Sequence, residues 1–401
     1  MNLSRRSDHA IEVFVVAGEH SGDALGAKLM AAIRAAAARP VHFAGVGGEQ
    51  MEAEGLRSLF PMSEVAVMGP LAILAALPRL VRRINEAADA GAKADPDAVV
   101  IIDSPEFTHP IARRIRKRLP DVAIVDYVSP SVWAWRPGRA ARMRAYVDHV
   151  MALLPFEPDV HARLGGPSCT YVGHPLIERL PDIQAADSAG LARELGLDGS
   201  RRTLVVLPGS RRSEVERLMQ PFGAAIGLLG ERQGPLNLII PAVDSVRDLI
   251  GAYASAWPAP IHVVSGEARK LAAFRGADAA LAASGTVTLE LALAATPMIV
   301  AYRVDALAAR LRFLVKTPHF ALANLVLGER AFPELMQEDC TPGKLADALH
   351  ALLTDPTTLA AQRQALARVP ALMRLETGTP SEAAARLVLE HASRREEVAA
   401  V

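Results

Sequence analysis

Short apolar runs alternate with longer amphipathic segments along most of the chain, and this alternation predicts the fold. The first half contains four runs rich in β-branched and other apolar residues, at positions 13–16, 99–102, 122–125 and 150–154. The intervening segments 24–38 and 110–119 carry apolar residues at helical spacing. Because strand–helix–strand alternation produces parallel sheets covered on both faces, the first half is predicted to be an α/β domain.

The same alternation begins again after residues 181–202, which are rich in Asp, Ala, Gly and Ser and predict a linker with a short helix. The candidate strands that follow are residues 203–207, 236–240, 261–264, 277–282 and 298–301. Two doubly wound units in tandem place the carboxyl ends of two sheets around a central cleft, where open α/β sheets bind ligands. The predicted fold class is therefore α/β, with two Rossmann-like domains and a ligand site in the cleft.

Composition limits the kinds of partner the protein can have and indicates the compartment in which it works. The chain has 401 residues, of which 51% are hydrophobic, so it is long enough for two domains with large cores. Lys and Arg together number 44, as do Asp and Glu, and this balance indicates no nucleic-acid partner. Cys169 and Cys340 are far apart and form no CxxC motif, which argues against a disulfide framework or a structural zinc site and favours the cytoplasm.

No segment is predicted to direct export or to cross a membrane. Residues 1–10 include several charged side chains and lack the long apolar stretch of a signal peptide. Residues 65–77 are apolar, but Gly-Pro interrupts them, and a membrane span needs about 20 apolar residues.

A surface that contacts anionic lipid is predicted in the first domain. The apolar segment 65–77 is accompanied there by a basic cluster, which comprises Arg113, Arg114, Arg116, Lys117, Arg118, Arg136, Arg139, Arg142 and Arg144. An apolar segment combined with basic residues is the composition of a peripheral membrane surface. A buried helix and a solvated basic helix are the respective alternatives.

The first predicted strand is followed directly by a candidate ligand-binding turn. In this turn, AGEHSGD at residues 17–23, Gly18 and Gly22 allow the backbone to approach a ligand at a helix N-terminus. Capping of the helix by Ser21 or Asp23 is the alternative. The turn lacks the GxGxxG pattern of dinucleotide sites, which counts against a nicotinamide or flavin cofactor. A second turn, GVGG at 45–48, repeats the arrangement.

Asp103 follows the predicted strand 99–102 and is the candidate general base. A carboxylate at the carboxyl end of a buried parallel strand points into the cleft, where desolvation raises its pKa. Capping of the helix that begins near Pro105 is its alternative role.

The loop at residues 127–136, YVSPSVWAWR, places two tryptophans beside two serine hydroxyls. Aromatic rings flanked by polar groups suit stacking on a sugar or holding an apolar chain. Anchoring of the core by either ring is the alternative.

Two turns of the second domain suit a nucleoside diphosphate. Residues 207–211, LPGSR, follow a predicted strand and end in Arg211, whose guanidinium binds phosphate through two parallel hydrogen bonds. Residues 283–290, ASGTVTLE, repeat the arrangement, and Glu290 can accept both hydroxyls of a ribose. An ordinary capped helix is the alternative for each turn taken alone.

Several motifs occur in the order in which lipid-A-disaccharide synthases carry them, and the chain resembles that family from about residue 11 to residue 337. These motifs are AGEHSGD, GVGG, the aspartate of IDSPEF, YVSPSVWAWR, LPFE, VGHPL, LPGSR, SGTVTLE and VKTPHFALANLVLGERAFPELMQ. The resemblance implies a GT-B-like fold. Its domains would be an acceptor and membrane-facing domain at 1–182, a UDP-sugar domain at 183–355, and C-terminal helices at 356–401 that return to the first domain.

The resemblance also implies a reaction in lipid A biosynthesis. The family joins UDP-2,3-diacylglucosamine to 2,3-diacylglucosamine 1-phosphate (lipid X), and forms a β-1',6-linked disaccharide 1-phosphate and UDP with inversion at the anomeric carbon. Neither a metal nor a cofactor is implied. Peripheral attachment to the cytoplasmic face of the inner membrane is implied, and a homodimer remains open.

The family's functional residues map onto matching positions of this chain. Asp103 is implied as the base, with Glu19 as its competitor for that role, and Arg211 as the group that stabilises the departing UDP. The implied substrate-binding residues are Ser21, Gly22, Ser129, Trp133, Gly209, Ser210, Ser284, Gly285, Thr286, Glu290 and Asn324.

Departures from the family pattern lie mostly on the acceptor and membrane-facing side. They comprise His20, Ala72, Glu106, Thr108, Asp126 and Ala323. They bear on acyl length and acceptor preference more than on the reaction. A UDP-N-acetylglucosamine 2-epimerase, or another UDP-sugar enzyme on this fold, is the nearest rival function. A non-catalytic UDP-sugar-binding or membrane-scaffolding protein is the rival from another class.

Overall fold

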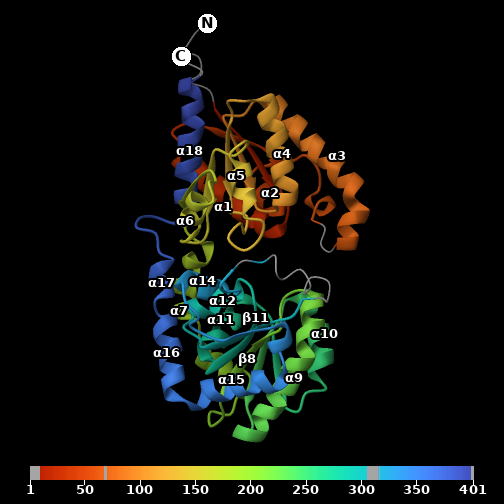
Figure 1. Cartoon of the computed structure of the whole chain (residues 1–401), viewed down its shortest axis with the longest axis vertical. Coiled ribbons are helices and arrows are strands. Elements are labelled where there is room, and N and C mark those ends of the chain that lie inside the picture. Colours follow the sequence, from red (N-terminus) through yellow and green to blue (C-terminus); the bar gives the residue numbers. More distant parts are fainter. Residues whose placement is uncertain (1–9, 67–69, 305–314, 316, 399–401) are drawn as a thin grey trace. The chain divides into compact units, whose positions relative to one another are not determined.

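The computed structural model describes residues 10–66, 70–304, 315 and 317–398, with the side chains of 70–75 and 395–398 excepted. The chain forms two compact units (Figure 1). Unit 1 contains residues 1–175 and 375–401, and unit 2 contains residues 176–374. The chain therefore leaves unit 1, completes unit 2 and returns.

Unit 1 is built on a parallel seven-stranded sheet in the order β3-β2-β1-β4-β5-β6-β7. The strands are β1 (Ile11–Ala17), β2 (Val41–Val46), β3 (Arg57–Ser58), β4 (Ala98–Ile102), β5 (Ala123–Tyr127), β6 (His149–Ala152) and β7 (Ser168–Tyr171). The helices are α1 (His20–Ala36), α2 (Glu49–Ala53), α3 (Pro70–Ala94), α4 (Pro105–Arg118), α5 (Gly138–Met143), α6 (Glu157–Arg163) and α18 (Pro380–Val398).

The alternation of side chains along β1 divides the core of unit 1 into two layers. Val13 and Val15 pack with residues of α1 and α18, whereas Phe14 and Val16 pack with residues of α3 and α4. Successive side chains of a strand point to opposite faces, so a continuous apolar run indicates a strand covered on both sides. Figure 1 shows α1 and α18 near one another and α3 beside α4.

Unit 2 repeats this architecture with a parallel six-stranded sheet in the order β10-β9-β8-β11-β12-β13. Its strands are β8 (Thr203–Leu207), β9 (Asn237–Pro241), β10 (Ile261–Val264), β11 (Ala279–Ala283), β12 (Met298–Tyr302) and β13 (Glu334–Met336). Its helices are α7 (Leu180–Ala185), α8 (Ser188–Glu194), α9 (Arg212–Gln233), α10 (Asp244–Ala254), α11 (Glu267–Gly276), α12 (Val287–Leu293), α14 (Leu322–Leu327), α15 (Pro342–Thr354), α16 (Pro356–Leu366) and α17 (Val369–Leu372).

The predicted fold class is confirmed, and the return of a C-terminal helix to the first domain is confirmed for α18. Residues Ala384 and Val388 of α18 belong to the same core cluster as Leu29 of α1. Helices α16 and α17 belong to unit 2.

Candidate functional site

The order of strands in unit 1 identifies where it binds a ligand. The chain leaves β1 for β2 on one side of the sheet and leaves β4 for β5 on the other, so β1 and β4 flank the topological switch point. Ligands of doubly wound sheets bind there, beyond the carboxyl ends of the strands. Because Ala17 pairs with Ile102, the turns that carry Glu19 and Asp103 start side by side.

The close approach of these two turns requires Gly18. A Cβ atom at this position would lie 2.8 Å from the Cβ of Ser104, nearer than real Cβ atoms come to such neighbours. Gly22 is less constrained, since a Cβ there would lie 3.4 Å from the backbone oxygen of Ile102. Gly18 of the predicted ligand turn therefore allows this turn and the turn that carries Asp103 to pack closely against each other.

Asp103 lies on a strained backbone that several hydrogen bonds hold in place. Asp103 and Ser104 have φ angles of 50° and 44°, in the left-handed region that non-glycine residues seldom adopt. The N–H of Ser104 donates to Oδ1 of Asp103 at 2.7 Å, and the hydroxyl of Thr108 donates to the carbonyl oxygen of Asp103 at 2.7 Å. The predicted alternative, an aspartate that caps α4, is not what forms: Ser104 occupies the N-cap position and no side chain caps the helix. Strain of this kind collects at functional sites.

The environment of Asp103 gives it the pKa of a useful base. Burial and the charge of Glu19 raise the pKa of Asp103 to about 6, although the N–H of Ser104 opposes the shift. Glu19 in turn accepts a hydrogen bond from the Ser21 hydroxyl at 2.9 Å. Glu19, Ser21 and Asp103, which the sequence assigned to one site, are therefore brought together.

Asp23 serves the second glycine turn. Its carboxylate accepts hydrogen bonds from the N–H groups of Gly48, Gln50 and Met51, at 2.8, 3.1 and 3.0 Å. These are the first N–H groups of α2, so Asp23 caps α2 and ties the GVGG turn to α1. The capping role considered for Asp23 is thus real, but it acts on a different helix.

Ser129 and Trp133 have partners inside unit 1. The hydroxyl of Ser129 lies 2.9 Å from Nε2 of His161. Trp133 packs edge-on against Phe156, with ring centroids 5.6 Å apart, and its indole N–H donates to Glu157 at 3.2 Å. The structure uses Trp133 as a packing residue, and its contact with a substrate stays a prediction.

A row of contacting polar side chains lies next to the sheet, and sequence reasoning missed it. Asp126 on β5 is fully buried, and its Oδ2 lies 3.2 Å from Nε2 of His109 without the alignment of a hydrogen bond. Nδ1 of His109 lies 3.0 Å from the hydroxyl of Tyr146, to which Arg113 donates at 3.1 Å. The sequence did contain a signal for these contacts, since Asp126 interrupts the apolar run of β5.

Unit 2 has its own switch point, between β8 and β11, and a cavity of about 350 Å³ lies there. Leu207 of β8 pairs with Ala282 of β11, so the turns that follow both strands meet. The predicted residues that line this cavity are Gly209, Ser210, Arg211, Ser284, Gly285, Thr286 and Glu290. Predicted binding residues from two motifs distant in sequence are therefore brought into one cavity.

Glu214 changes the expected role of the backbone in this cavity. Its carboxylate accepts hydrogen bonds from the N–H groups of Ser210 and Arg211, at 3.2 and 3.3 Å, at the start of α9. The expectation that backbone N–H donors of the turn bind a diphosphate is thus corrected for these two groups, because a carboxylate already occupies them. The Arg211 side chain lies 3.4 Å from Glu214 but is 62% exposed, which leaves donors for an anion.

Asn324 is placed outside this cavity's lining. It is fully buried, its amide donates to Glu334 at 2.7 Å, and its Oδ1 accepts the N–H of Ala331 at 3.0 Å. These bonds hold the segment between α14 and β13, and its contact with a donor stays a prediction.

Much of the predicted basic cluster is neutralised by acidic neighbours. Arg116 lies 2.5 Å from Asp148, Arg118 lies 2.6 Å from Asp89, and Arg139 pairs with Glu106. Within the described residues, no group of three or more His, Cys, Asp and Glu side chains is arranged to hold a metal ion. No helix in the described part of the chain is long and apolar enough to cross a membrane.

Comparisons with known proteins identify the family of the chain. The family described as lipid-A-disaccharide synthetase matches residues 13–388. The chain is 49% identical over 378 residues to the lipid-A-disaccharide synthase of Rhodopseudomonas palustris strain HaA2, covering 94% of this chain and 95% of that protein. It is 49% identical over 400 residues to the same enzyme of Nitrobacter hamburgensis, covering 98% of each.

Solved structures agree at the level of the fold. The UDP-GlcNAc 2-epimerase of Neisseria meningitidis, bound to UDP-GlcNAc, superposes with a TM-score of 0.58 at 11% identity, covering 96% of this chain and 99% of that one. The units described above are thus Rossmann-like and GT-B-like. From its sequence match over nearly the whole length, the chain belongs to the lipid-A-disaccharide synthase family.

Proposed function

We propose that the turns of unit 1 bind the acceptor and remove its proton, and that the cavity of unit 2 binds the UDP of the donor. The observation that carries the proposal is Asp103, a strained aspartate at the switch point whose pKa is raised to about 6. A general base works best when its pKa lies near the working pH. Between the two acids left open by the sequence, Asp103 is favoured over Glu19 as the base.

The proposed reaction is a single displacement. The 6-hydroxyl oxygen of lipid X forms a bond to the anomeric carbon of UDP-2,3-diacylglucosamine, as the bond from that carbon to the UDP oxygen breaks. The hydroxyl proton passes to Asp103, and the configuration at carbon inverts. Negative charge that develops on the departing diphosphate is stabilised by Arg211 and by the hydroxyls of Ser210 and Thr286, whereas the Ser284 hydroxyl donates to the carbonyl oxygen of Phe320 at 2.9 Å.

As a member of this family the chain is a hexosyltransferase that uses a UDP-sugar. The rival function, UDP-N-acetylglucosamine 2-epimerase, has support only from structures at low sequence identity, which share the fold. The non-catalytic alternative predicts UDP binding without turnover.

A direct assay tests the proposal. Purified protein is incubated with UDP-2,3-diacylglucosamine and lipid X, and UDP release is followed together with disaccharide phosphate by mass spectrometry. Equal amounts of both products are expected. UDP without disaccharide would indicate hydrolysis or a different acceptor, and epimerised UDP-N-acetylglucosamine without lipid would support the rival.

The pH dependence of turnover separates Asp103 from Glu19. A base must be deprotonated, so kcat/KM should rise with pH through the pKa of Asp103, about 6. Replacing Glu19 with Gln removes the negative charge that raises this pKa, so the acid limb should move to lower pH while the plateau is largely kept. Glu49→Gln, which changes an exposed side chain on α2, serves as the control and should leave the acid limb of the pH profile in place. A Glu19→Gln variant inactive at every pH would make Glu19 the base.

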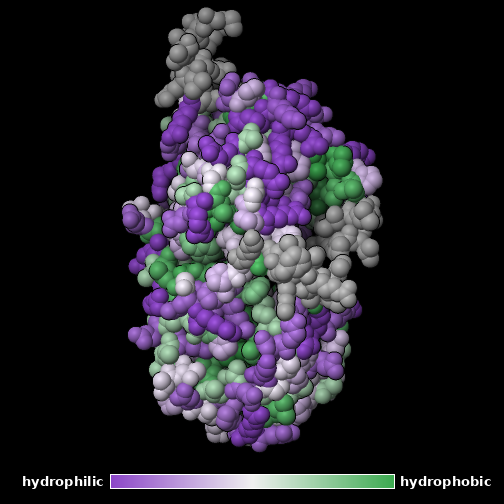
Figure 2. Space-filling view, in the orientation of Figure 1, coloured by the Kyte–Doolittle hydropathy of each residue, from purple (hydrophilic) through white to green (hydrophobic). Residues whose placement is uncertain are grey.

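Peripheral membrane contact is proposed for the outer face of α3. Figure 2 shows an apolar patch over this helix, where Leu77 and Val81 are 48% and 44% exposed. Arg79 and Arg82 beside them are also exposed. Exposed apolar side chains next to arginines are typical of helices that lie on anionic lipid. In the predicted segment 65–77, residues 67–69 and the side chains of 70–75 lie outside the described residues.

Liposome sedimentation tests this surface. The double variant Leu77→Ser and Val81→Ser should bind anionic liposomes about tenfold or more weakly, because it removes two side chains that would enter the lipid interface. Its thermal unfolding should be little changed, since both side chains are already exposed. Leu372→Ser, an exposed position of unit 2, is the control. A loss of folding in the double variant would instead assign the patch to the core.

A further inference from the structure

We propose that Lys270 and Arg179 are positioning residues, which hold the Glu290 carboxylate so that it accepts the ribose hydroxyls of the nucleotide. The inference rests on the proposed function, because it assumes that the unit 2 cavity binds UDP. Four side chains, Arg179, Glu267, Lys270 and Glu290, form what is called here the Glu290 network.

The contacts of the network converge on one oxygen of Glu290. Nζ of Lys270 lies 2.7 Å from Oε1 of Glu290 and 2.8 Å from Oε1 of Glu267. Nη1 of Arg179 lies 3.6 Å from the same Oε1 of Glu290, and its Nη2 donates to Glu267 at 2.5 Å. Both cations reach Glu290 through Oε1, which fixes the rotation of the carboxylate and leaves Oε2 for a ligand's hydroxyls.

Burial makes this arrangement energetically necessary. The Glu290 side chain is 11% exposed, and those of Lys270 and Arg179 are 25% and 28% exposed. A carboxylate withdrawn from water to this extent needs partners of opposite charge. Two carboxylates and two cations balance in the network, whereas removal of Lys270 leaves Glu267 and Glu290 to one guanidinium.

The network also joins three segments of unit 2. Glu267 and Lys270 lie one helical turn apart on α11, Glu290 lies on α12, and Arg179 precedes α7. Lys270 and Glu290 line the donor cavity, whereas Arg179 and Glu267 line a neighbouring cavity of about 730 Å³. The network therefore spans two cavities: Lys270 reaches Glu290 within the donor cavity, and Arg179 and Glu267 connect that pair to the second cavity.

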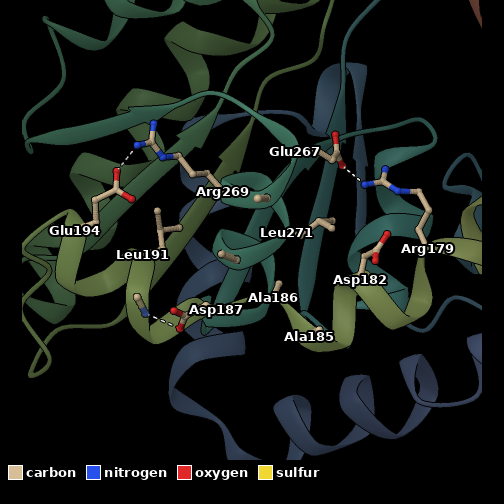
Figure 3. A pocket seen from close by; sticks show the side chains of 13 residues that line it. Arg179, Asp182, Ala185, Ala186, Asp187, Leu191, Glu194, Glu267, Arg269 and Leu271 are labelled. Atoms are coloured by element: carbon tan, nitrogen blue, oxygen red, sulfur yellow. Dashed lines mark hydrogen bonds and ion pairs between the residues drawn. The ribbon is translucent and has the colours of Figure 1, made fainter.

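Figure 3 shows the second cavity and also supplies a control. Arg179 and Glu267 point toward one another at one end, and a separate ion pair joins Arg269 to Glu194 at 2.6 Å. Arg269 is the chain neighbour of Lys270 and has the same charge, but its described ion pair is with Glu194. Its removal tests whether loss of any ion pair on α11 has the same effect.

The experiment measures selectivity for the ribose hydroxyls. Full-length wild type, Lys270→Met, Lys270→Arg and Arg269→Met are titrated calorimetrically with UDP and with 2',3'-dideoxy-UDP. Wild type should prefer UDP by about 10- to 100-fold, the range expected for hydrogen bonds to a charged acceptor. Lys270→Met should reduce this preference to about threefold or less, whatever its effect on the affinity for dideoxy-UDP. Arg269→Met should keep the wild-type preference, and Lys270→Arg should restore part of it.

The ratio of the two affinities separates positioning from general damage, since a distorted cavity would weaken both ligands alike. If Lys270→Met does not fold, Lys270→Gln and Arg179→Met replace it in the same titrations. An unchanged preference in the Lys270 variants, with UDP binding by wild type intact, overturns this inference and leaves the proposed function standing. Wild-type protein that does not bind UDP overturns both.

Discussion

Replacement of Asp103 by Asn is expected to reduce turnover by about 10²- to 10⁴-fold, the usual contribution of a general base. The asparagine can still accept the Ser104 N–H that Oδ1 of Asp103 accepts at 2.7 Å, so the strained turn should persist. UDP binding should be unchanged, because the donor cavity belongs to unit 2. Steady-state kinetics and UDP calorimetry on the same preparation check the two expectations together.

The same variant should be more stable than wild type at alkaline pH. The folded-state pKa of Asp103 is raised from 3.8 to about 6, so the folded protein holds this proton more tightly than the unfolded chain. Wild-type stability from this group is therefore present below pH 4 and is lost as the pH rises through about 6. The Asp103→Asn variant would avoid that loss, worth about 1–3 kcal/mol at pH 8, and would match wild type near pH 4.

If Asp103→Asn turned over substrate as fast as wild type, Asp103 would have no part in the mechanism.

Replacement of Arg211 by Met is expected to lower kcat/KM by about 10²- to 10³-fold. The guanidinium lines the cavity that is proposed to bind UDP, and removal of one donor to a developing charge typically costs this much. UDP affinity should fall as well, whereas the pH at which the acid limb appears should not move, because Arg211 lies in unit 2.

Arg212→Met is the matched control. Arg212 is adjacent in sequence, its side chain is 67% exposed, and it pairs with Glu216 on the same helix rather than lining the cavity. Its loss should change kcat/KM by less than about threefold. Equal effects of both substitutions would show that Arg211 acts through the general charge of α9 rather than through contact with the diphosphate.

The pattern of apolar residues predicted the central strands better than the edge strands, and it missed three of the four edge strands. The expected run at 203–207 coincides with the central strand β8, and the run at 261–264 coincides with the one edge strand that was predicted, β10. The short strands β3, β7 and β13 were not predicted, because edge strands have one open side and carry polar residues, as in the sequence SCTY of β7. Helix α4 begins at Pro105, where the sequence predicted a helix start, although the apolar spacing alone indicated a helix only from residue 110; proline is well suited to the first turn.

Individual residues of the candidate site were predicted from the sequence, but most contacts between their side chains were not. A residue that ends a buried parallel strand must lie at the carboxyl edge of the sheet, which explains why Asp103 and Arg211 could be found from sequence. The contact with Glu19 that raises the pKa of Asp103 and the contact of Lys270 with Glu290 depend on side-chain directions between separate elements. The hydrogen bond from the Ser210 N–H to Glu214, four residues on, depends on the side-chain direction at the start of α9. No periodicity encodes those directions.

Ribosomal synthesis delivers the last helix of unit 1 only after the whole of unit 2. At about 5–20 residues per second, the segment from Leu176 to Arg374 takes roughly 10–40 s to translate. During that interval the apolar face of α1, including Leu29 and Ile33, waits for Ala384 and Val388 of α18. The unit whose synthesis begins first is thus the last to be completed, and its α1 face lacks this apolar cover until α18 has been made.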